Sequence, residues 1–188
     1  NDHSTDDSGA LLDEISATDS RLDVIHLDKN IGMCAARGVG IKRSSSPWIG
    51  FLDDDDRAHP SMYGTLRQRA LDTDAEIAIC GTRLVDKNGR IIKRWAYFSK
   101  EFEATDNLCV AFCRRRFGGS MVWNKLYRSH IMKGSADLQF KWRPNAVEDT
   151  LVNIGCFREA KKVAIVNACL HDYLIHDESF VHSADHIT

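Results

Sequence analysis

Apolar residues follow a helical spacing in some segments of the first half of the chain and form short continuous runs in others. Leu11, Leu12 and Ile15 share one face of a helix that Ser8 can cap. Further helices are expected over residues 33–42 and after Pro60, which suits a first helical turn. Strands are predicted over residues 23–26, 48–52 and 76–83.

The second half continues the alternation less regularly. Asp86-Lys87-Asn88-Gly89 is typical of a hairpin turn. A helix is predicted over residues 148–160, with strands over residues 162–166 and 170–175. Strands that alternate with helices indicate an α/β fold with a mostly parallel sheet covered on both faces.

Size and composition narrow the class of protein. The chain has 188 residues and a net charge of −2, which suits a single domain over residues 1–188 and gives no basic field for nucleic acid. No apolar run approaches the roughly 20 residues of a membrane span, and the polar, acidic start is unlike a signal peptide. The six cysteines lie mostly in apolar company, so we expect buried, reduced thiols and a cytoplasmic protein.

Four consecutive aspartates, Asp53 to Asp56, follow the apolar run Phe51-Leu52. Adjacent carboxylates repel one another unless a cation neutralises them, and their oxygens suit Mg²⁺ or Mn²⁺. On a strand end Asp53 and Asp55 would point to the same side and could share one metal that holds a diphosphate. The alternative is a solvated acidic turn in which Asp56 caps the next helix.

Five segments together carry a resemblance that none carries alone. Residues 1–8, 30–40, 51–56, 123–127 and 148–150 read NDHSTDDS, NIGMCAARGVG, FLDDDD, WNKLY and EDT. In this order they resemble the family 2 glycosyltransferases of bacterial surface-glycan assembly, which have the GT-A fold. Gly38 stands where the family usually has Asn, and His3 where it commonly has Gly.

The resemblance implies a site for a nucleotide-diphosphate sugar. Asp2, Arg37, Asp53 and Lys125 would contact the donor. Asp53, Asp55 and a late histidine, His176, would hold Mn²⁺ or Mg²⁺. The metal would neutralise the phosphates and the charge on the departing nucleotide. For Asp2 the alternative is a cap on the following helix, and for Arg37 an exposed surface arginine.

The resemblance also implies an inverting transfer to a hydroxyl acceptor, which needs a general base. Glu148 and Asp149 stand at a predicted helix start, where a carboxylate stays ionised. We expect Asp149 to be the base in preference to Glu148; the alternative is that both only cap the helix. The acceptor would be a glycan or a lipid-linked glycan, with peripheral association at the inner membrane face left open.

Two other functions compete with glycosyl transfer. The family's first strand and first helix have no counterpart here, so we expect an amino-terminally truncated domain, which could be a non-catalytic module that binds metal or a partner. A haloacid-dehalogenase-type phosphatase also places D-x-D after an apolar strand. That class needs Thr or Val two residues after the second Asp, where this chain has Arg57.

Overall fold

A computed structural model describes residues 1–97, 101–103, 107–136 and 148–175. The chain divides into two compact units, Asn1–Ser45 and Ser46–Thr188. In the parts of the chain that the structure describes, no helix is long and apolar enough to cross a membrane.

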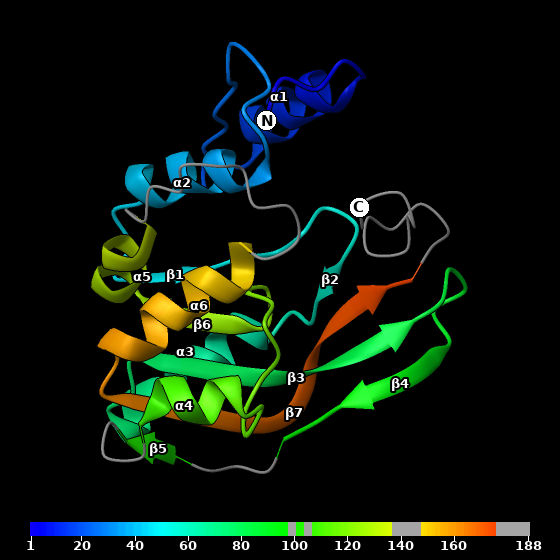
Figure 1. Ribbon diagram of the computed structural model, residues 1–188. Coiled ribbons are helices and arrows are strands. Elements are labelled where there is room, and N and C mark those ends of the chain that lie inside the picture. Colours follow the sequence, from blue (N-terminus) through cyan, green and yellow to red (C-terminus); the bar gives the residue numbers. More distant parts are fainter. Residues whose placement is uncertain (98–100, 104–106, 137–147, 176–188) are drawn as a thin grey trace, which may run out of the picture. The chain divides into compact units, whose positions relative to one another are not determined.

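The first unit contains helices α1 (Ser8–Thr18) and α2 (Met33–Arg43), joined by an extended segment (Figure 1). The strand predicted over residues 23–26 is wrong, because this segment belongs to no strand ladder in the described residues; its backbone meets the first residue of the chain instead. The Asn1 ammonium donates to Ile25 O at 2.8 Å, and Leu27 N donates to Asn1 O at 3.0 Å. Two bonds to one residue do not make a ladder.

The second unit is a seven-stranded sheet with helices on both faces. Its main path runs β1-β6-β3-β7-β2, while β4 pairs with β3 and β5 with β7. The strands are β1 (Trp48–Gly50), β2 (Arg57–Ala58), β3 (Ile77–Val85), β4 (Ile91–Trp95), β5 (Glu101–Glu103), β6 (Lys125–Arg128) and β7 (Lys162–Leu174). The helices are α3 (Met62–Thr73), α4 (Leu108–Cys113), α5 (Ser129–Ala136) and α6 (Glu148–Glu159).

The α/β class is confirmed, but the expectation of a mostly parallel sheet is wrong for the described strands. Only β3 and β7 pair in parallel; the other pairings are antiparallel. The prediction assumed that strands adjacent in sequence are adjacent in the sheet, and it therefore missed an inserted strand. Strand β6, from later in the chain, lies between β1 and β3 and runs antiparallel to both.

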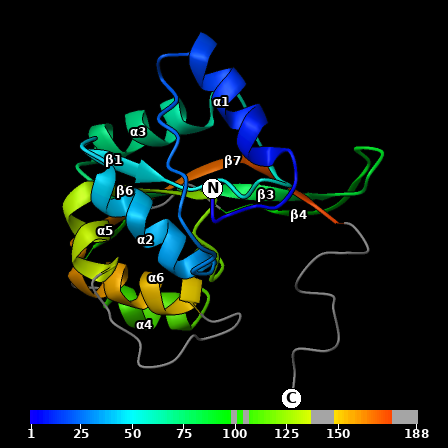
Figure 2. The same ribbon diagram turned by 90° about the horizontal axis from the view of Figure 1, so that it is seen from above.

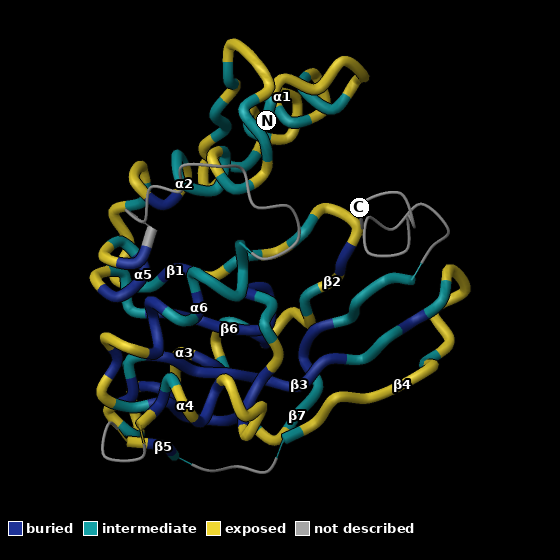
Figure 3. Tube along the Cα trace, in the orientation of Figure 1, coloured by how far each residue is buried: buried dark blue, intermediate teal, exposed yellow. Residues whose placement is uncertain are grey.

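Each face of the sheet has its own apolar core. Helix α3 covers one face and α4, α5 and α6 cover the other (Figure 2). Met62, Leu66 and Ala70 of α3 pack with Ala78 and Cys80 of β3. On the other face four phenylalanine rings lie with centroids 4.7–5.1 Å apart: Phe102, Phe112, Phe117 and Phe157. The central strands between these cores are the most buried part of the unit (Figure 3).

Alternation along β6 decides which side chains reach which face. Leu126 joins the α3 core, whereas Tyr127 bonds to Asn153 of α6 on the opposite face. Lys125, two residues before Tyr127, shares that face. A lysine is thereby turned into the interior on the α6 side of the sheet, with 0% of its surface exposed.

Candidate active site

The four aspartates form a turn rather than the end of a strand. Strand β1 stops at Gly50, and Asp56 N donates to Asp53 O at 3.1 Å. Asp54 and Asp55 therefore stand exposed at the tip, while Asp53 is half-buried and Asp56 is buried. The same-side argument from strand alternation does not apply to a turn, and joint action of Asp53 and Asp55 stays a prediction.

Two contacts fix this acidic turn to its surroundings. Tyr63 of α3 donates its hydroxyl to Phe51 O at 2.8 Å, just before the turn. Burial, together with the charges of Cys80 and Asp53, raises the pKa of Tyr63 to about 12, so its hydroxyl remains a donor at neutral pH. Asp56 turns inward, and its Oδ1 accepts from Leu174 N at 3.0 Å. Asp56 therefore joins the turn to the end of β7 instead of capping α3.

A stack of rings connects the acidic turn with the segment before β6. His171 of β7 is fully buried, and its Nε2 lies 3.3 Å from Asp56 Oδ2 without the alignment of a hydrogen bond. The Trp123 ring stacks on the His171 ring, with centroids 4.1 Å apart and planes inclined by 10°. Trp123 is 3% exposed, so it packs in the core.

Asp149 lies in the first turn of α6, as the sequence predicts. Its Oδ2 accepts from Val122 N at 3.2 Å, which ties this carboxylate to the residue next to Trp123. The acidic turn and Asp149 thus belong to one chain of contacts through Asp56, His171, Trp123 and Val122. Glu148 starts the same helix and is half-buried.

Lys125 lies near Asp149 but points inward. Its Nζ donates to Gly119 O at 3.0 Å, to Asn124 Oδ1 at 2.9 Å and to Met121 O. Burial lowers the pKa of Lys125 to about 7, and the charge of Asp149 opposes that shift. A contact with donor phosphate stays a prediction, but this geometry favours a role inside the protein.

Asn153 is a residue that sequence reasoning missed. It is 0% exposed, and its Oδ1 accepts from the Tyr127 hydroxyl at 2.8 Å. An asparagine four positions after Asp149 on the same face of a helix was the available signal.

In the first unit, Asp2 holds the loop that precedes α2. Its Oδ1 accepts from Ile31 N at 2.7 Å and its Oδ2 from Gly32 N at 2.8 Å, while Asn30 Nδ2 donates to Asp2 O. Asp2 does not cap α1, where Asp6 Oδ1 accepts from Ser8 N at 3.1 Å. Arg37 is half-buried on α2. Donor contacts from Asp2 and Arg37 stay predictions.

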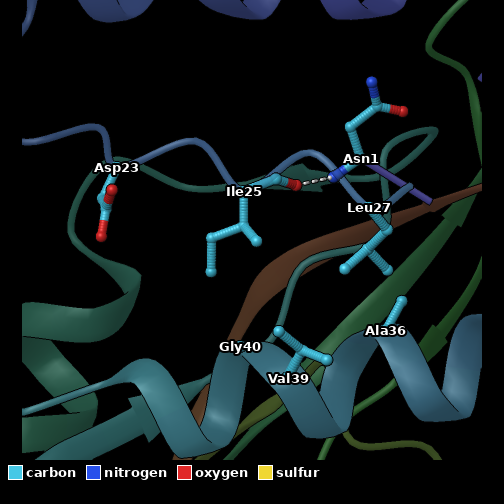
Figure 4. Close-up of a pocket in the computed structure, with 7 residues that line it drawn as sticks. All are labelled: Asn1, Asp23, Ile25, Leu27, Ala36, Val39 and Gly40. Carbon is cyan, nitrogen blue, oxygen red and sulfur yellow. Dashed lines mark hydrogen bonds between the residues drawn. The ribbon is translucent and has the colours of Figure 1, made fainter. Parts of the chain in front are cut away.

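The first unit also contains a pocket of about 210 Å³ between the extended segment and α2 (Figure 4). Ile25 and Leu27 point from the extended segment toward Ala36 and Val39 of α2. The lining residues are Asn1, Asp23, Ile25, Leu27, Ala36, Val39 and Gly40, so neither Asp2 nor Arg37 lines it.

The described residues include no group of three or more His, Cys, Asp or Glu side chains arranged to hold a metal ion. His176 lies outside the described residues. Mg²⁺ commonly uses one or two carboxylates, substrate phosphates and water rather than a cage of protein ligands. The exposed Asp55 and half-buried Asp53 fit that kind of site, but not a cage.

A family model described as glycosyl transferase family 2 matches residues 1–162, which include the acidic turn and Asp149. The chain belongs to this family. It is 30% identical over 182 residues to the uncharacterized glycosyltransferase EpsJ of Bacillus subtilis (strain 168), covering 92% of this chain and 50% of that protein. It is 27% identical over 182 residues to the glycosyltransferase GlyA of Streptococcus pneumoniae serotype 4, covering 93% of this chain and 25% of that protein.

The fold of this family 2 member matches a solved structure. A crystal structure of residues 1–349 of TarS from S. aureus in complex with UDP-GlcNAc superposes with a TM-score of 0.74 at 17% identity. The match covers 97% of this chain and 50% of that one, and it confirms the expected GT-A fold. The chain spans half or less of the length of EpsJ and GlyA.

Proposed function

We propose that this chain is a catalytic domain of an inverting glycosyltransferase, which moves a sugar from a nucleotide-diphosphate sugar to a hydroxyl acceptor in polysaccharide synthesis. The family match over residues 1–162 carries the proposal. Two similar proteins support its details: the succinoglycan biosynthesis protein ExoO of Rhizobium meliloti, 34% identical over 95 residues, covering 50% of this chain and 27% of that protein, and TarS, solved with UDP-GlcNAc.

In the proposed reaction the acceptor oxygen attacks the anomeric carbon of the donor. A new C–O bond forms, the bond from that carbon to the diphosphate breaks, and the nucleoside diphosphate leaves. The hydroxyl proton passes to Asp149, which acts as general base. The bond from Val122 N to Asp149 Oδ2 supports this role, because it orients the carboxylate.

The acidic turn is the proposed donor side of the second unit. Asp53 would hold ribose and support Mn²⁺ or Mg²⁺, Asp55 would bind the metal directly, and His176 would be a further metal ligand. The bound metal would supply positive charge for the diphosphate that departs. The contacts from Tyr63 and Asp56 support the proposal, since they fix both ends of the turn and leave Asp55 exposed.

The first unit would contribute Asp2 and Arg37 to nucleotide binding. Both carboxylate oxygens of Asp2 already accept backbone N–H groups. Each oxygen has a second lone pair, so Asp2 can still accept from a base or a ribose. We propose a cytoplasmic location with a glycan or lipid-linked glycan as acceptor. The six cysteines support it because none of them forms a disulfide, although only Cys80 and Cys156 are buried.

The test of this function is release of nucleoside diphosphate from a panel of UDP-, GDP- and dTDP-sugars, with a mixture of glycan acceptors and Mn²⁺. We expect release from one nucleotide class and a product of inverted anomeric configuration. Binding of the nucleotide without any turnover would indicate the alternative, a non-catalytic module. Release of inorganic phosphate instead of nucleoside diphosphate would indicate a phosphatase.

A further inference from the structure

A buried polar network lies beneath residues 118–122, the segment that leads into β6. The Lys125 ammonium has three N–H groups, and three oxygens accept from it: Gly119 O, Met121 O and Asn124 Oδ1. Asn124 is itself buried, and its Nδ2 donates to Cys80 O of β3 at 2.8 Å. The ammonium is thereby fixed to the central strand as well as to the segment.

Asn153 of α6 binds the same segment from the other side. Its Nδ2 donates to Ser120 O at 2.5 Å and to Asp149 O at 2.9 Å. Three successive carbonyls, those of residues 119, 120 and 121, are therefore bound by two buried side chains. Tyr127 donates its hydroxyl to Asn153 Oδ1, which fixes which way the Asn153 amide points.

The outer side of the segment faces solvent. Gly119 is exposed, and Ser120 and Met121 are half-buried, although their carbonyls are bound inside. Gly118 allows the turn with a φ of +64°, and a Cβ there would lie 3.3 Å from Lys125 Cε. At the other end Val122 N donates to the proposed base, Asp149. The segment is thus bound through its carbonyls and stays partly exposed at Ser120 and Met121, next in sequence to the residue that binds Asp149.

We propose that Lys125 and Asn153 are positioning residues of the transfer reaction. They hold residues 119–122 against the first turn of α6, orient Asp149 through the Val122 N–H group, and make Ser120 and Met121 part of the surface that an acceptor meets. This inference rests on the proposed function, because it takes Asp149 as the base.

The experiment compares Lys125→Met and Asn153→Leu with Lys93→Met, which removes a lysine from exposed strand β4. Three properties are measured: hydrogen exchange of the amides of residues 119–122, affinity for UDP with Mn²⁺, and the rate and acceptor KM of sugar transfer. We expect faster exchange at Val122 and transfer about a hundredfold slower, as for a misplaced reacting group. UDP affinity should be unchanged, as should every property of Lys93→Met.

The two positioning variants remove buried polar groups, so they can also lower stability. Tyr127→Phe keeps the ring in the core and removes only the hydroxyl that orients the Asn153 amide. If Lys125→Met and Asn153→Leu both unfold, Tyr127→Phe tests the positioning role instead. For this variant we expect a smaller loss of transfer rate and an unchanged affinity for UDP.

The outcomes separate this inference from the function on which it rests. A wild-type protein that turns over no nucleotide sugar contradicts the proposed function. An active wild type whose variants lose protection at Val122 but keep the normal rate and acceptor KM contradicts the positioning role alone. Unchanged protection in all variants shows that the network does not hold the segment, and it also overturns the inference.

Discussion

Lys125 should make the stability of the protein depend on pH near neutrality. Its pKa falls from the ordinary value of 10.5 to about 7 in the folded chain. Between these values the unfolded chain binds more protons at this site than the folded one does, so stability rises with pH. The buried neighbours Cys80 and Cys156 have raised pKa values of about 12 and about 11, so they stay protonated in the folded state.

We therefore expect the free energy of unfolding of the wild type to increase between about pH 6 and about pH 8, relative to that of Lys125→Met. Above the folded-state pKa of Lys125, the increase approaches about 1.4 kcal/mol for each pH unit. Denaturant titrations of both proteins at the two pH values measure it. An identical pH dependence in the two proteins would show that Lys125 is not a titrating buried group.

Among the four aspartates of the acidic turn, Asp56 is expected to contribute most to the stability of the protein. Asp56→Ala leaves Leu174 N without its acceptor and His171 without its neighbouring carboxylate. Loss of a buried partner costs about 1–3 kcal/mol. Asp54→Ala, at the exposed tip of the same turn, should change stability by less than about 0.5 kcal/mol. Urea unfolding compares the two; equal effects would contradict the division of the turn into an anchored residue and an exposed tip.

At the scale of elements, β1 and α3 come unusually close at Gly50. A Cβ on this residue would lie 2.5 Å from Tyr63 Cε1, so the Tyr63 ring would have to move away. Because Tyr63 also donates to Phe51 O, that movement would release the start of the acidic turn.

Gly50→Ala should therefore destabilise the protein by about 1–3 kcal/mol, the usual range for overpacking. Gly64→Ala, in α3 with nothing near its Cβ position, should be neutral or slightly stabilising, because alanine suits a helix interior better. Thermal unfolding of the two variants is the measurement. A Gly50→Ala protein as stable as the wild type would mean that Tyr63 does not fix the exit of β1.

The elements that sequence reasoning found best were those fixed by local chemistry. The helix of residues 33–43, the turn at residues 86–89 and the helix that begins at Glu148 all lie where they were expected. The two strands predicted over residues 162–166 and 170–175 are one strand, β7, with register shifts opposite Gly81. The position of β6 between β1 and β3 could not be predicted from a local pattern, because the sequence of residues 125–128 does not determine which strands pair with them.

The same limit applies to the candidate site. The sequence placed Asp149 correctly in the first turn of a helix, because the acidic pair Glu148-Asp149 stands directly before a helical spacing of apolar residues. It did not show that Lys125 turns inward, because its direction depends on the register of β6 against β3, a strand that is distant in sequence. Likewise, Asp56 differs from its three neighbours only through contacts with β7.

For the whole molecule, the proposed metal gives a prediction about the acidic turn. EDTA should abolish transfer, and Mn²⁺ or Mg²⁺ should restore it. Asp55→Ala should stay inactive at any metal concentration, whereas Asp54→Ala should keep its activity, because Asp54 is not one of the proposed ligands. Transfer rates measured across a metal titration give the answer, and transfer that proceeds unchanged in EDTA would contradict the metal role of Asp53 and Asp55.

The central claim is glycosyl transfer with Asp149 as the base, and the most direct measurement is transfer rate together with nucleotide affinity for Asp149→Asn and Glu148→Gln. Loss of a general base slows a reaction by about a hundredfold to ten-thousandfold. We predict that loss for Asp149→Asn, with unchanged UDP affinity and near-normal stability, and little change for Glu148→Gln. A normal rate in Asp149→Asn would contradict the claim, and a loss in Glu148→Gln alone would assign the base to Glu148.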